Sequence, residues 1–340
     1  MPSTIENDLQ IISDEFCFHG EIKNASVLVT GASGLIGSII IKSLSKLNND
    51  FDLNLKIFAH ARNRNKIETI FSDSHDVEFL YSDIQNITLD QDIDYIFHCA
   101  SPTSSKFYVE SPVETIDAIF NGTNRVLELS KQLNARSIVM LSSLESYGTI
   151  KDDLQSIDEK TMGLVDPISV RSSYPLAKKM SECLCHSYHK QFNVPVKIAR
   201  LTQVFGAGIS KDDNRVFAQF ARSVVEKRSI ILHTNGRSKK PYCYTTDTLS
   251  ALFHILFRGE SGEAYNVANP ATYISIRDMA GMLSEKYPAS DVIEKVMINH
   301  NYAPETKLRL DTTKLENLGW KPAVDLGEMF QRLINDIKEN

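Results

Sequence analysis

The stretch Val27-Leu-Val-Thr-Gly31-Ala-Ser-Gly34-Leu-Ile-Gly37 decides the fold of this chain. Its first residues form a short apolar run typical of a buried strand, and the residues after it carry apolar side chains spaced for one face of a helix. Glycines between a strand and a helix allow backbone N–H groups to approach a pyrophosphate, and the last glycine allows the helix to pack closely on the sheet. The G-x-x-G-x-x-G spacing in this context predicts a dinucleotide site, whereas in isolation it would indicate only a flexible turn.

Short β-branched runs alternate with amphipathic stretches from about Ser26 to Arg200, which predicts βαβ units and a parallel sheet. The expected strands are Ser26–Thr30, Leu53–Ala59, Val77–Tyr81, Tyr95–Cys99, Ser137–Leu141 and Val196–Ala199. The expected helices between them are Leu35–Lys46, Arg64–Ile70, Val113–Gln132 and Tyr174–Gln191. We therefore predict an α/β fold with a Rossmann-type, doubly wound parallel sheet in residues 25–200.

The alternation weakens after Arg200, and residues 201–340 are predicted to form mainly a smaller C-terminal α/β substrate lobe. Its expected helices are Val216–Lys227, Asp247–Phe257, Ile276–Lys286, Asp311–Leu318 and Leu326–Lys338, and its expected strands are Ile230–His233 and Tyr242–Thr245. Residues 1–24 form a polar, partly amphipathic leader whose role the pattern does not indicate.

The composition is that of an ordinary globular protein, with 42% hydrophobic and 24% charged residues among 340. The 37 basic and 43 acidic residues give a net charge of −6 without a long basic block, so nucleic acid is not an expected partner. The 5 cysteines are scattered with no C-x-x-C pair, so we expect no metal site and no disulfide framework. We find no export signal and no apolar stretch that could span a membrane, and we expect a cytoplasmic protein without a membrane partner.

Tyr174 and Lys178 are four residues apart at the start of an expected helix, where they share a face. The Lys178 ammonium is expected to stabilise the tyrosinate and to lower the phenol pKa, which is about 10 when unperturbed. Such a tyrosine can take a proton from a substrate hydroxyl as hydride leaves the carbon for a nicotinamide, or return the proton in the reverse direction. The alternative interpretation is a surface Tyr–Lys pair on an amphipathic helix.

The fifth expected strand leads into Ser142-Ser143-Leu144-Glu145, which places small hydroxyls at the carboxyl edge of the sheet, where α/β proteins bind ligands. Ser143 can hydrogen-bond a reacting oxygen. Glu145 can serve as a second acid or base if it is partly desolvated, because burial raises a carboxyl pKa. A solvated loop glutamate is the alternative interpretation.

The choice between NAD and NADP stays open at the end of the second expected strand. The chain there reads Ala59-His60-Ala61-Arg62-Asn63-Arg64, without an acid that could bind both ribose hydroxyls. Arg62 or Arg64 can meet a 2′-phosphate, which favours NADP, although two solvated arginines would give the same pattern. Asp83, after the third strand, can accept from the adenine amino group or cap a turn.

With the glycine turn, the serine strand end and Y-x-x-x-K in this order, the chain resembles an extended short-chain dehydrogenase/reductase of the NAD(P)-dependent nucleotide-sugar epimerase/dehydratase family. The resemblance covers nearly all of residues 25–335. Further matching stretches are His98-Cys-Ala-Ser101, Asn121-Gly-Thr123, Arg200, Tyr244-Thr-Thr-Asp247, Asn266-Val-Ala268 and Leu318-Gly-Trp320-Lys-Pro322. The resemblance implies a bound NAD or NADP, a nucleoside-diphosphate sugar substrate, and a homodimer formed through the two long helices of the first lobe.

The resemblance also implies which residues contact the ligands. The implied cofactor contacts are Gly31, Ser33, Gly34, Leu35, Ile36, Gly37, Arg62, Asn63, Asp83, Ile84, Ala100, Ser101, Asn121 and Lys178. The implied substrate contacts are Ser101, Ser143, Tyr174, Gln203, Arg215, Lys240 and Arg309. The three basic residues in this second set are included for the charge that they offer to a diphosphate, and the alternative interpretation is a solvated loop position, which is where most lone basic residues lie.

Within the family, the pattern is most similar to UDP-glucuronate decarboxylases in the stretch Ala100-Ser-Pro102-Thr-Ser-Ser and the following Tyr108, Pro112, Thr115 and Asn121-Gly-Thr. These decarboxylases also carry a glutamate at the Glu145 position. A sugar 4,6-dehydratase would have an aspartic acid where Leu144 stands, and leucine cannot protonate a leaving hydroxyl, so dehydration is not expected. The chain departs from the family pattern at Gln203, Ala207 and Lys240, where asparagine, proline and arginine are usual.

Three functions therefore stay open at this stage. The leading hypothesis is an NAD(P)-dependent, epimerase- or decarboxylase-like enzyme that transfers hydride at a ring hydroxyl through a transient 4-keto sugar. The second is an NADPH-dependent nucleotide-sugar reductase. The third is a catalytically idle nucleotide-binding regulatory subunit, which would keep the fold without needing Tyr174, Lys178 and Ser143.

Overall fold

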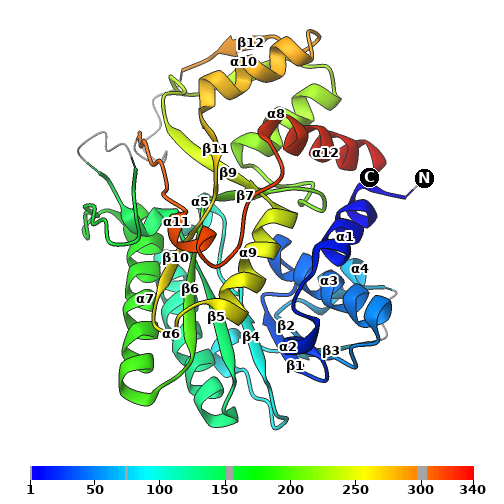
Figure 1. Ribbon diagram of the computed structural model, residues 1–340. Coiled ribbons are helices and arrows are strands. Elements are labelled where there is room, and N and C mark those ends of the chain that lie inside the picture. Colours follow the sequence, from blue (N-terminus) through cyan, green and yellow to red (C-terminus); the bar gives the residue numbers. More distant parts are fainter. Residues whose placement is uncertain (1, 73–75, 151–155, 297–304) are drawn as a thin grey trace.

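A seven-stranded parallel sheet forms the centre of the computed structural model, which describes residues 2–72, 76–150, 156–296 and 305–340 (Figure 1). The strand order is β10-β6-β5-β4-β1-β2-β3. The chain adds β2 and β3 on one side of β1 and the later strands on the other side, beginning with β4. The strands are β1 (Ser26–Thr30), β2 (Lys56–Ala61), β3 (Val77–Tyr81), β4 (Tyr95–His98), β5 (Ser137–Ser143), β6 (Val196–Leu201) and β10 (Ala264–Val267). This order confirms the predicted doubly wound fold, in which ligands bind at the carboxyl ends of the strands beside this switch between β1 and β4.

Helices cover both faces of the sheet because successive strand residues point to opposite sides. Val27 and Val29 of β1 pack into one apolar cluster, and Leu28 packs into the other. The first cluster is covered by α3 (Leu35–Phe51) and α9 (Thr245–Arg258), and the second by α6 (Pro112–Leu133) and α7 (Ser173–Phe192). The remaining helices beside this sheet are α4 (Arg64–Ile70), α5 (Ser105–Glu110) and the 3-10 turns η1 (Ile84–Asn86), η2 (Leu144–Tyr147) and η3 (Val170–Ser172).

A smaller lobe follows the carboxyl end of β6 and lies above the central sheet in Figure 1. Its three-stranded sheet has the order β11-β9-β7, with β7 (Gln203–Phe205), β9 (Lys239–Tyr244) and β11 (Asn269–Ser275). A second sheet pairs β8 (Ile230–Leu232) with β12 (Val292–Glu294). The helices of this lobe are α8 (Val216–Val225), α10 (Ile276–Lys286) and α12 (Leu326–Glu339), which pack around a separate apolar cluster, and α11 (Thr313–Glu316) lies beside β10.

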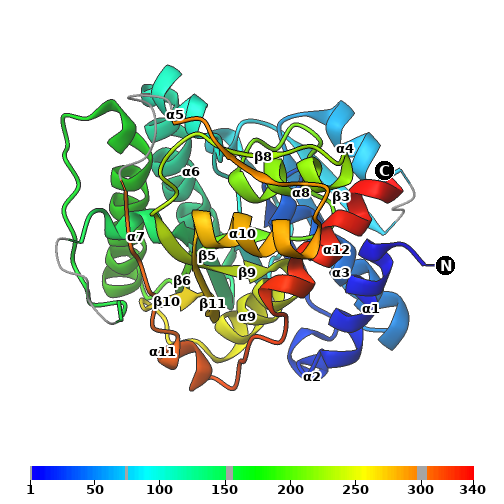
Figure 2. The same cartoon turned by 90° about the horizontal axis from the view of Figure 1, so that it is seen from above.

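The leader contains two helices, α1 (Thr4–Glu15) and α2 (His19–Ile22). Figure 2 shows α1 beside α12, with the two chain ends close together at one edge of the molecule. None of the helices in the described part of the chain has the length and apolarity that a membrane crossing would need.

Both ends of the second strand differ from the sequence prediction, and its start does so for a local reason. The second strand begins at Lys56 rather than Leu53, because Asp52 and Asn54 adopt left-handed conformations that keep the chain in a turn. The strand then runs on to Ala61, so Arg62 directly follows its carboxyl end. The short strand β10 was not predicted, and it returns the chain from the second lobe to pair with β6 in the central sheet.

Candidate active site

The glycine turn between β1 and α3 leaves an open cradle of backbone. A Cβ atom on Gly31, whose φ is +73°, would lie 2.7 Å from the backbone nitrogen of Ala100, and one on Gly37 would overlap the carbonyl group of Gly31. Gly34 caps α3 without a side-chain hydrogen bond, so the first amides of this long helix have no capping partner. These features fit a dinucleotide pyrophosphate, because free amides and the positive end of the helix dipole both favour an anion.

Some of the residues after β2 and β3 make contacts within the protein, and others are exposed and could contact a dinucleotide. The Asn63 side chain caps α4 by accepting from the Lys66 amide at 3.0 Å, and the Arg64 guanidinium lies 4.7 Å from the ring centroid of Tyr81. Arg62 is exposed, and Asp83 is exposed without making a capping hydrogen bond. Arg62 and Asp83 are therefore the side chains of this set that stay available for the adenosine end of a dinucleotide.

Tyr174 and Lys178 both lie buried on the first turns of α7, with 8% of Tyr174 exposed. The Lys178 ammonium donates to the carbonyl oxygen of Leu141 on β5 at 2.8 Å and lies 5.8 Å from the Tyr174 ring centroid. Burial lowers the pKa of Lys178 to about 8, although the carboxylate of Glu182 acts in the opposite direction.

The expected lowering of the Tyr174 pKa is wrong for this structure. Burial raises the pKa of Tyr174 to about 12, with a further rise from the charge of Glu145, and hydrogen bonds with Ser143 and Tyr108 only partly offset these effects. The spacing of four residues correctly predicts a shared helix face. It does not reveal that this face is buried or that the Lys178 ammonium is bound to a strand carbonyl.

Ser143 ends β5, and its hydroxyl oxygen accepts from the Glu145 amide at 3.2 Å. The Glu145 carboxylate forms an ion pair with Arg171 at 2.8 Å and is partly exposed. Leu144 points away into an apolar cluster with Tyr147 and is only 2% exposed. The strand end thus presents Ser143 and Glu145 to the site and buries Leu144.

Arg171 is a site residue that the sequence analysis missed. Its Nη2 atom donates to Glu145, whereas its buried Nε and Nη1 atoms have no hydrogen-bond partner among the described residues. Lys240 on β9 belongs to the same group: burial lowers its pKa, the charge of Glu145 raises it, and the charge of Arg171 lowers it. Two cations and one carboxylate therefore meet beside Tyr174, and unsatisfied buried N–H donors are rare in folded proteins. The available signal was the position of Arg171 three residues before Tyr174.

Tyr108, on α5, is a second residue that the sequence analysis gave no role. Its ring stacks on Tyr174 with centroids 4.3 Å apart, and its hydroxyl donates to the carbonyl oxygen of Pro102 at 3.2 Å. The Ser173 hydroxyl donates to the Tyr108 carbonyl oxygen at 2.9 Å. These contacts fix the segment after β4 against the start of α7.

Two other predicted substrate contacts, Gln203 and Arg215, lie in the smaller lobe. Gln203 begins β7 and pairs with Tyr242 of β9, the strand that carries Lys240. Arg215 forms an ion pair with Asp213 at 2.5 Å and donates to the Val204 carbonyl at 3.2 Å, so its guanidinium is used within its own lobe.

Three further predicted residues bond locally or face solvent. The Ser101 hydroxyl donates to the Pro102 carbonyl at 3.1 Å, and exposed Asn121 donates to Asp117 at 2.5 Å. Arg309 is exposed and lies 5.7 Å from the Tyr273 ring centroid. The ligand contacts proposed for these residues stay predictions.

Known proteins match this chain in sequence and in fold. The family model described as NAD dependent epimerase/dehydratase family matches residues 27–268. UDP-glucuronic acid decarboxylase 4 of Arabidopsis thaliana is 30% identical over 92% of this chain and 68% of that protein. An epimerase from Methanothermobacter thermautotrophicus has a TM-score of 0.83 at 22% identity, covering 98% of this chain and 96% of that one. UDP-glucuronic acid 4-epimerase from Bacillus cereus, solved with UDP-glucuronic acid and NAD, has a TM-score of 0.78 at 22% identity over 92% and 99% of the two chains.

Proposed function

The chain belongs to the NAD dependent epimerase/dehydratase family, and on this premise we propose that it oxidises a ring hydroxyl of a nucleoside-diphosphate sugar, passes through a transient 4-keto sugar and returns the hydride. The observation that carries the proposal is the buried Tyr174, whose pKa is raised by burial and lowered by the neighbouring Ser143 hydroxyl, with Lys178 one helical turn away. A protein that only bound nucleotides would have no use for this proton-transfer set.

NAD, when bound at the glycine turn, supplies the chemistry of accepting the hydride from the sugar carbon and giving it back. Tyr174 takes the hydroxyl proton as the phenolate, the minor form at neutral pH because burial raises its pKa, and later returns the proton. The hydroxyl of Ser143 hydrogen-bonds the same sugar oxygen. The Lys178 ammonium, fixed on the Leu141 carbonyl, adds positive charge that favours the phenolate. A ketone at this position acidifies adjacent C–H bonds and labilises a β-carboxylate.

The group formed by Glu145, Arg171 and Lys240 supports a sugar that carries a carboxylate. Arg171 has two buried nitrogen atoms, Nε and Nη1, without a partner beyond its bond to Glu145, and a planar guanidinium matches a carboxylate well. The curated relative from Arabidopsis thaliana is named for UDP-glucuronic acid. We therefore propose a nucleotide-linked uronic acid as the substrate, with decarboxylation or epimerisation as the reaction. Dehydration is disfavoured because the buried Leu144 cannot donate a proton.

The test is turnover of UDP-glucuronic acid, with UDP-glucose as the neutral comparison, followed by mass spectrometry and chromatography of the nucleotide sugars. Loss of carbon dioxide identifies a decarboxylase, and a new isomer identifies an epimerase. Tyr174→Phe should lower kcat by about 10²–10⁴-fold while NAD affinity changes little. Tyr188→Phe is a matched control, because Tyr188 lies on the same helix and its hydroxyl donates to Asn124. Equal inactivity of wild type and Tyr174→Phe on a broad panel of nucleotide sugars would support an idle regulatory subunit instead.

One observation favours a second candidate function, an NADPH-dependent nucleotide-sugar reductase. The exposed Arg62 directly follows the carboxyl end of β2, where NAD-binding proteins usually carry an acid. A reductase would consume NADPH in proportion to product, whereas a redox-neutral enzyme would turn over with catalytic NAD and no net absorbance change. Arg62→Ala should weaken NADP binding about tenfold more than NAD binding if Arg62 meets a 2′-phosphate.

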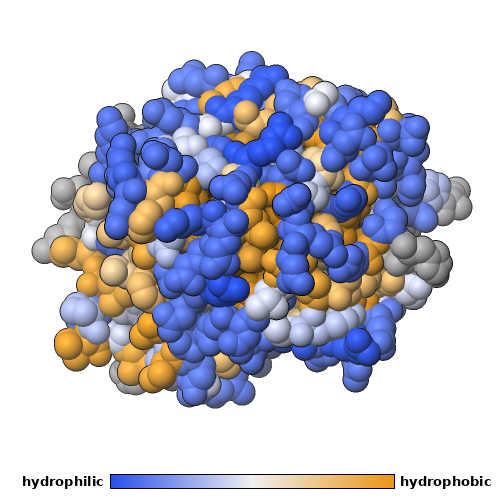
Figure 3. Space-filling view, turned by 90° about the horizontal axis from the view of Figure 1, so that it is seen from below, coloured by the Kyte–Doolittle hydropathy of each residue, from blue (hydrophilic) through white to orange (hydrophobic). Residues whose placement is uncertain are grey.

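We also propose that the protein forms a homodimer through α6 and α7. Large apolar side chains of these helices are exposed, namely Val113, Ile116, Met180 and Phe192, and Met180 is 52% exposed. Figure 3 shows apolar side chains along the left edge of the molecule, the side on which α7 lies in Figure 1. Light scattering should give twice the chain mass, and Met180→Lys should shift the distribution towards monomer.

A further inference from the structure

Residues 3–22, here called the N-terminal strap, lie outside the range matched by the family model and bridge the two lobes. The strap contains α1 and α2, and α1 begins with a capping box in which Ser3 and Glu6 exchange hydrogen bonds. Its amphipathic helix packs against α3, α9 and α12. The feature that the sequence left without a role is therefore an ordered part of the fold.

The strap is bonded to the substrate lobe through a buried carboxylate. Asp8 is 1% exposed, and its two oxygens accept from the Tyr244 hydroxyl at 2.7 Å and from Arg332 at 2.8 Å. The backbone and hydroxyl of Thr4 both donate to Glu339 at 2.9 Å. Because Tyr244 ends β9 while Arg332 and Glu339 belong to α12, the strap holds two separate elements of this lobe.

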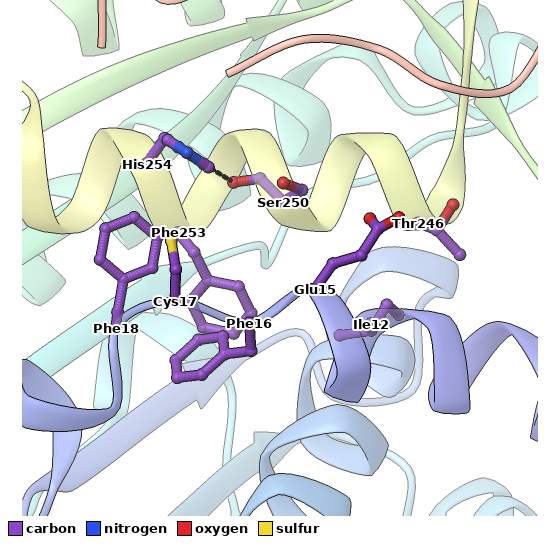
Figure 4. A pocket seen from close by; sticks show the side chains of 9 residues that line it. All are labelled: Ile12, Glu15, Phe16, Cys17, Phe18, Thr246, Ser250, Phe253 and His254. Carbon is purple, nitrogen blue, oxygen red and sulfur yellow. Dashed lines mark hydrogen bonds between the residues drawn. The ribbon is translucent and has the colours of Figure 1, made fainter. Parts of the chain in front are cut away.

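The other side of the strap is packed on the nucleotide lobe. The Ser13 hydroxyl donates to Asp50 of α3 at 2.5 Å, and the Phe16 ring lies edge-on to Phe253 of α9 with centroids 5.0 Å apart. Figure 4 shows Phe16 and Phe18 of the strap beside α9, around a cavity of about 20 Å³. A cavity of this size has room for about one water molecule, so this joint is a packed contact and not a ligand site.

The bonds of Asp8 continue from the strap towards the substrate side of the molecule. The Tyr244 hydroxyl, which donates to Asp8, also accepts from the Ala207 amide at 3.4 Å. The next amide, of Gly208, donates to Asp336 of α12 at 2.9 Å. The turn of residues 206–208 directly follows β7, which begins at Gln203, and β7 pairs with β9. Both elements that hold this turn are therefore elements that the strap binds.

We propose that Asp8 is a positioning residue for the substrate site: through Tyr244 and Arg332 it fixes the turn of residues 206–208, and with it β7 and β9, relative to the nucleotide lobe. The proposal deepens the proposed function, on which it rests. Asp8 touches no residue of the Tyr174 group, so it acts on affinity for the nucleotide sugar through the second lobe. The glycine turn that would hold the cofactor belongs to the first lobe and is not part of this chain of bonds.

The experiment compares Asp8→Ala, Asp8→Asn and Tyr244→Phe with the control Asp14→Ala, an exposed acid on the same helix. Asp8→Ala should raise KM for the nucleotide sugar, and the dissociation constant of UDP, by about tenfold. NAD affinity should stay within about twofold of wild type. Hydrogen exchange of peptides spanning residues 203–208 should become faster. Asp8→Asn keeps an acceptor for Tyr244 and should lie between Asp8→Ala and wild type, and Asp14→Ala should match wild type.

One result would overturn the proposal. The strap would be merely stabilising if Asp8→Ala lowered the melting temperature but left the UDP affinity and the exchange of residues 203–208 at the values of Asp14→Ala. If Asp8→Ala does not fold, Tyr244→Phe decides by the same measurements, since it removes only the hydroxyl shared by Asp8 and Ala207. UDP binding and hydrogen exchange need no turnover. An enzyme inactive on all nucleotide sugars would therefore contradict the proposed function while these two measurements still decide the role of Asp8.

Discussion

The ring of Tyr108 lies nearly parallel to the ring of Tyr174, with centroids 4.3 Å apart and an angle of 11° between the planes. Arg171 lies 5.0 Å from the Tyr108 centroid, and the Lys178 ammonium lies 5.8 Å from the Tyr174 centroid. Stacking of aromatic pairs contributes roughly 0.5–1.5 kcal/mol beyond the burial of area, enough to restrict the orientation of a ring. The Tyr174 phenol, which is proposed to carry the proton, is therefore oriented by Tyr108 of α5, a segment outside the Y-x-x-x-K motif.

Tyr108→Phe should move the pH dependence of the reaction. The variant keeps the stacked ring but loses the hydroxyl, which lowers the pKa of Tyr174 when its proton turns from the Pro102 carbonyl to the Tyr174 oxygen. The Tyr174 pKa should rise, so the ascending limb of kcat against pH should shift upward, and a shift of one unit lowers kcat on that limb about tenfold. Tyr108→Leu, which also removes the stack, should have the larger effect. An unchanged profile in Tyr108→Phe would show that the hydroxyl does not act on Tyr174.

Arg171→Lys should separate charge from geometry in substrate recognition. Lysine keeps the positive charge beside Glu145 but lacks the planar fork whose Nε and Nη1 atoms are unpaired in the described structure. KM for UDP-glucuronic acid should rise about 10–100-fold, while KM for UDP-glucose should change little. Arg136→Ala, an exposed arginine just before β5, is the control. Equal losses for both sugars would mean that Arg171 orders the site rather than binding the carboxylate.

The sequence predicts the sheet and most helices well because their patterns are local. The residue bounds of β1, β3, α4 and α10 agree with the prediction, and each has either a continuous apolar run or clear helical spacing. The short strand β10 has only four residues and no periodicity of its own. Its pairing with β6 depends on the chain returning from the second lobe, which no local pattern indicates.

The site is predicted less completely because its electrostatics depend on distant segments. Tyr174, Lys178, Ser143 and Glu145 follow from motifs and strand ends. Apart from its position three residues before Tyr174, nothing in the sequence distinguishes Arg171 from a solvated arginine. The structure shows that its Nε and Nη1 atoms are buried without a partner among the described residues. The sign of the Tyr174 pKa shift likewise depends on burial by residues that no spacing rule includes. Contacts between different segments, such as Arg171 with Glu145 at a separation of 26 residues and Ser173 with Tyr108 at 65, account for what the sequence alone did not show.

Gly37→Ala should destabilise the protein and weaken NAD binding, because a Cβ at this position would overlap the carbonyl group of Gly31 in the turn. The backbone must shift to admit it, and overpacking of this kind costs about 1–3 kcal/mol. Gly281→Ala is the matched control: nothing lies within 4 Å of a Cβ there, in the middle of α10. That substitution should stabilise the protein by about 0.5–1 kcal/mol, because alanine has the higher helix propensity. Urea unfolding and calorimetric titration with NAD measure both effects, and equal behaviour of the two variants would contradict the close approach of α3 to the turn.

Lys197 predicts a pH dependence of stability that is separate from catalysis. It is buried near the start of β6, where its ammonium donates to the Ser137 hydroxyl at 2.6 Å, and burial lowers its pKa to about 8 from a model-peptide value of 10.5. Between these two pH values the unfolded chain keeps a proton that the folded chain has released. This group therefore makes the free energy of unfolding rise with pH across that window, and below it the buried charge destabilises the fold.

Lys197→Met removes this titration and should be more stable than wild type near neutral pH. The advantage should shrink by about 3 kcal/mol between about pH 7 and pH 10.5, since one pKa unit corresponds to 1.36 kcal/mol. Urea unfolding at several pH values measures the difference between the two proteins, in which the titration of Lys178 cancels. Lys190→Met, at an exposed position on α7, should show no such trend. A constant difference between wild type and Lys197→Met would mean that Lys197 keeps an ordinary pKa and that its ammonium reaches solvent.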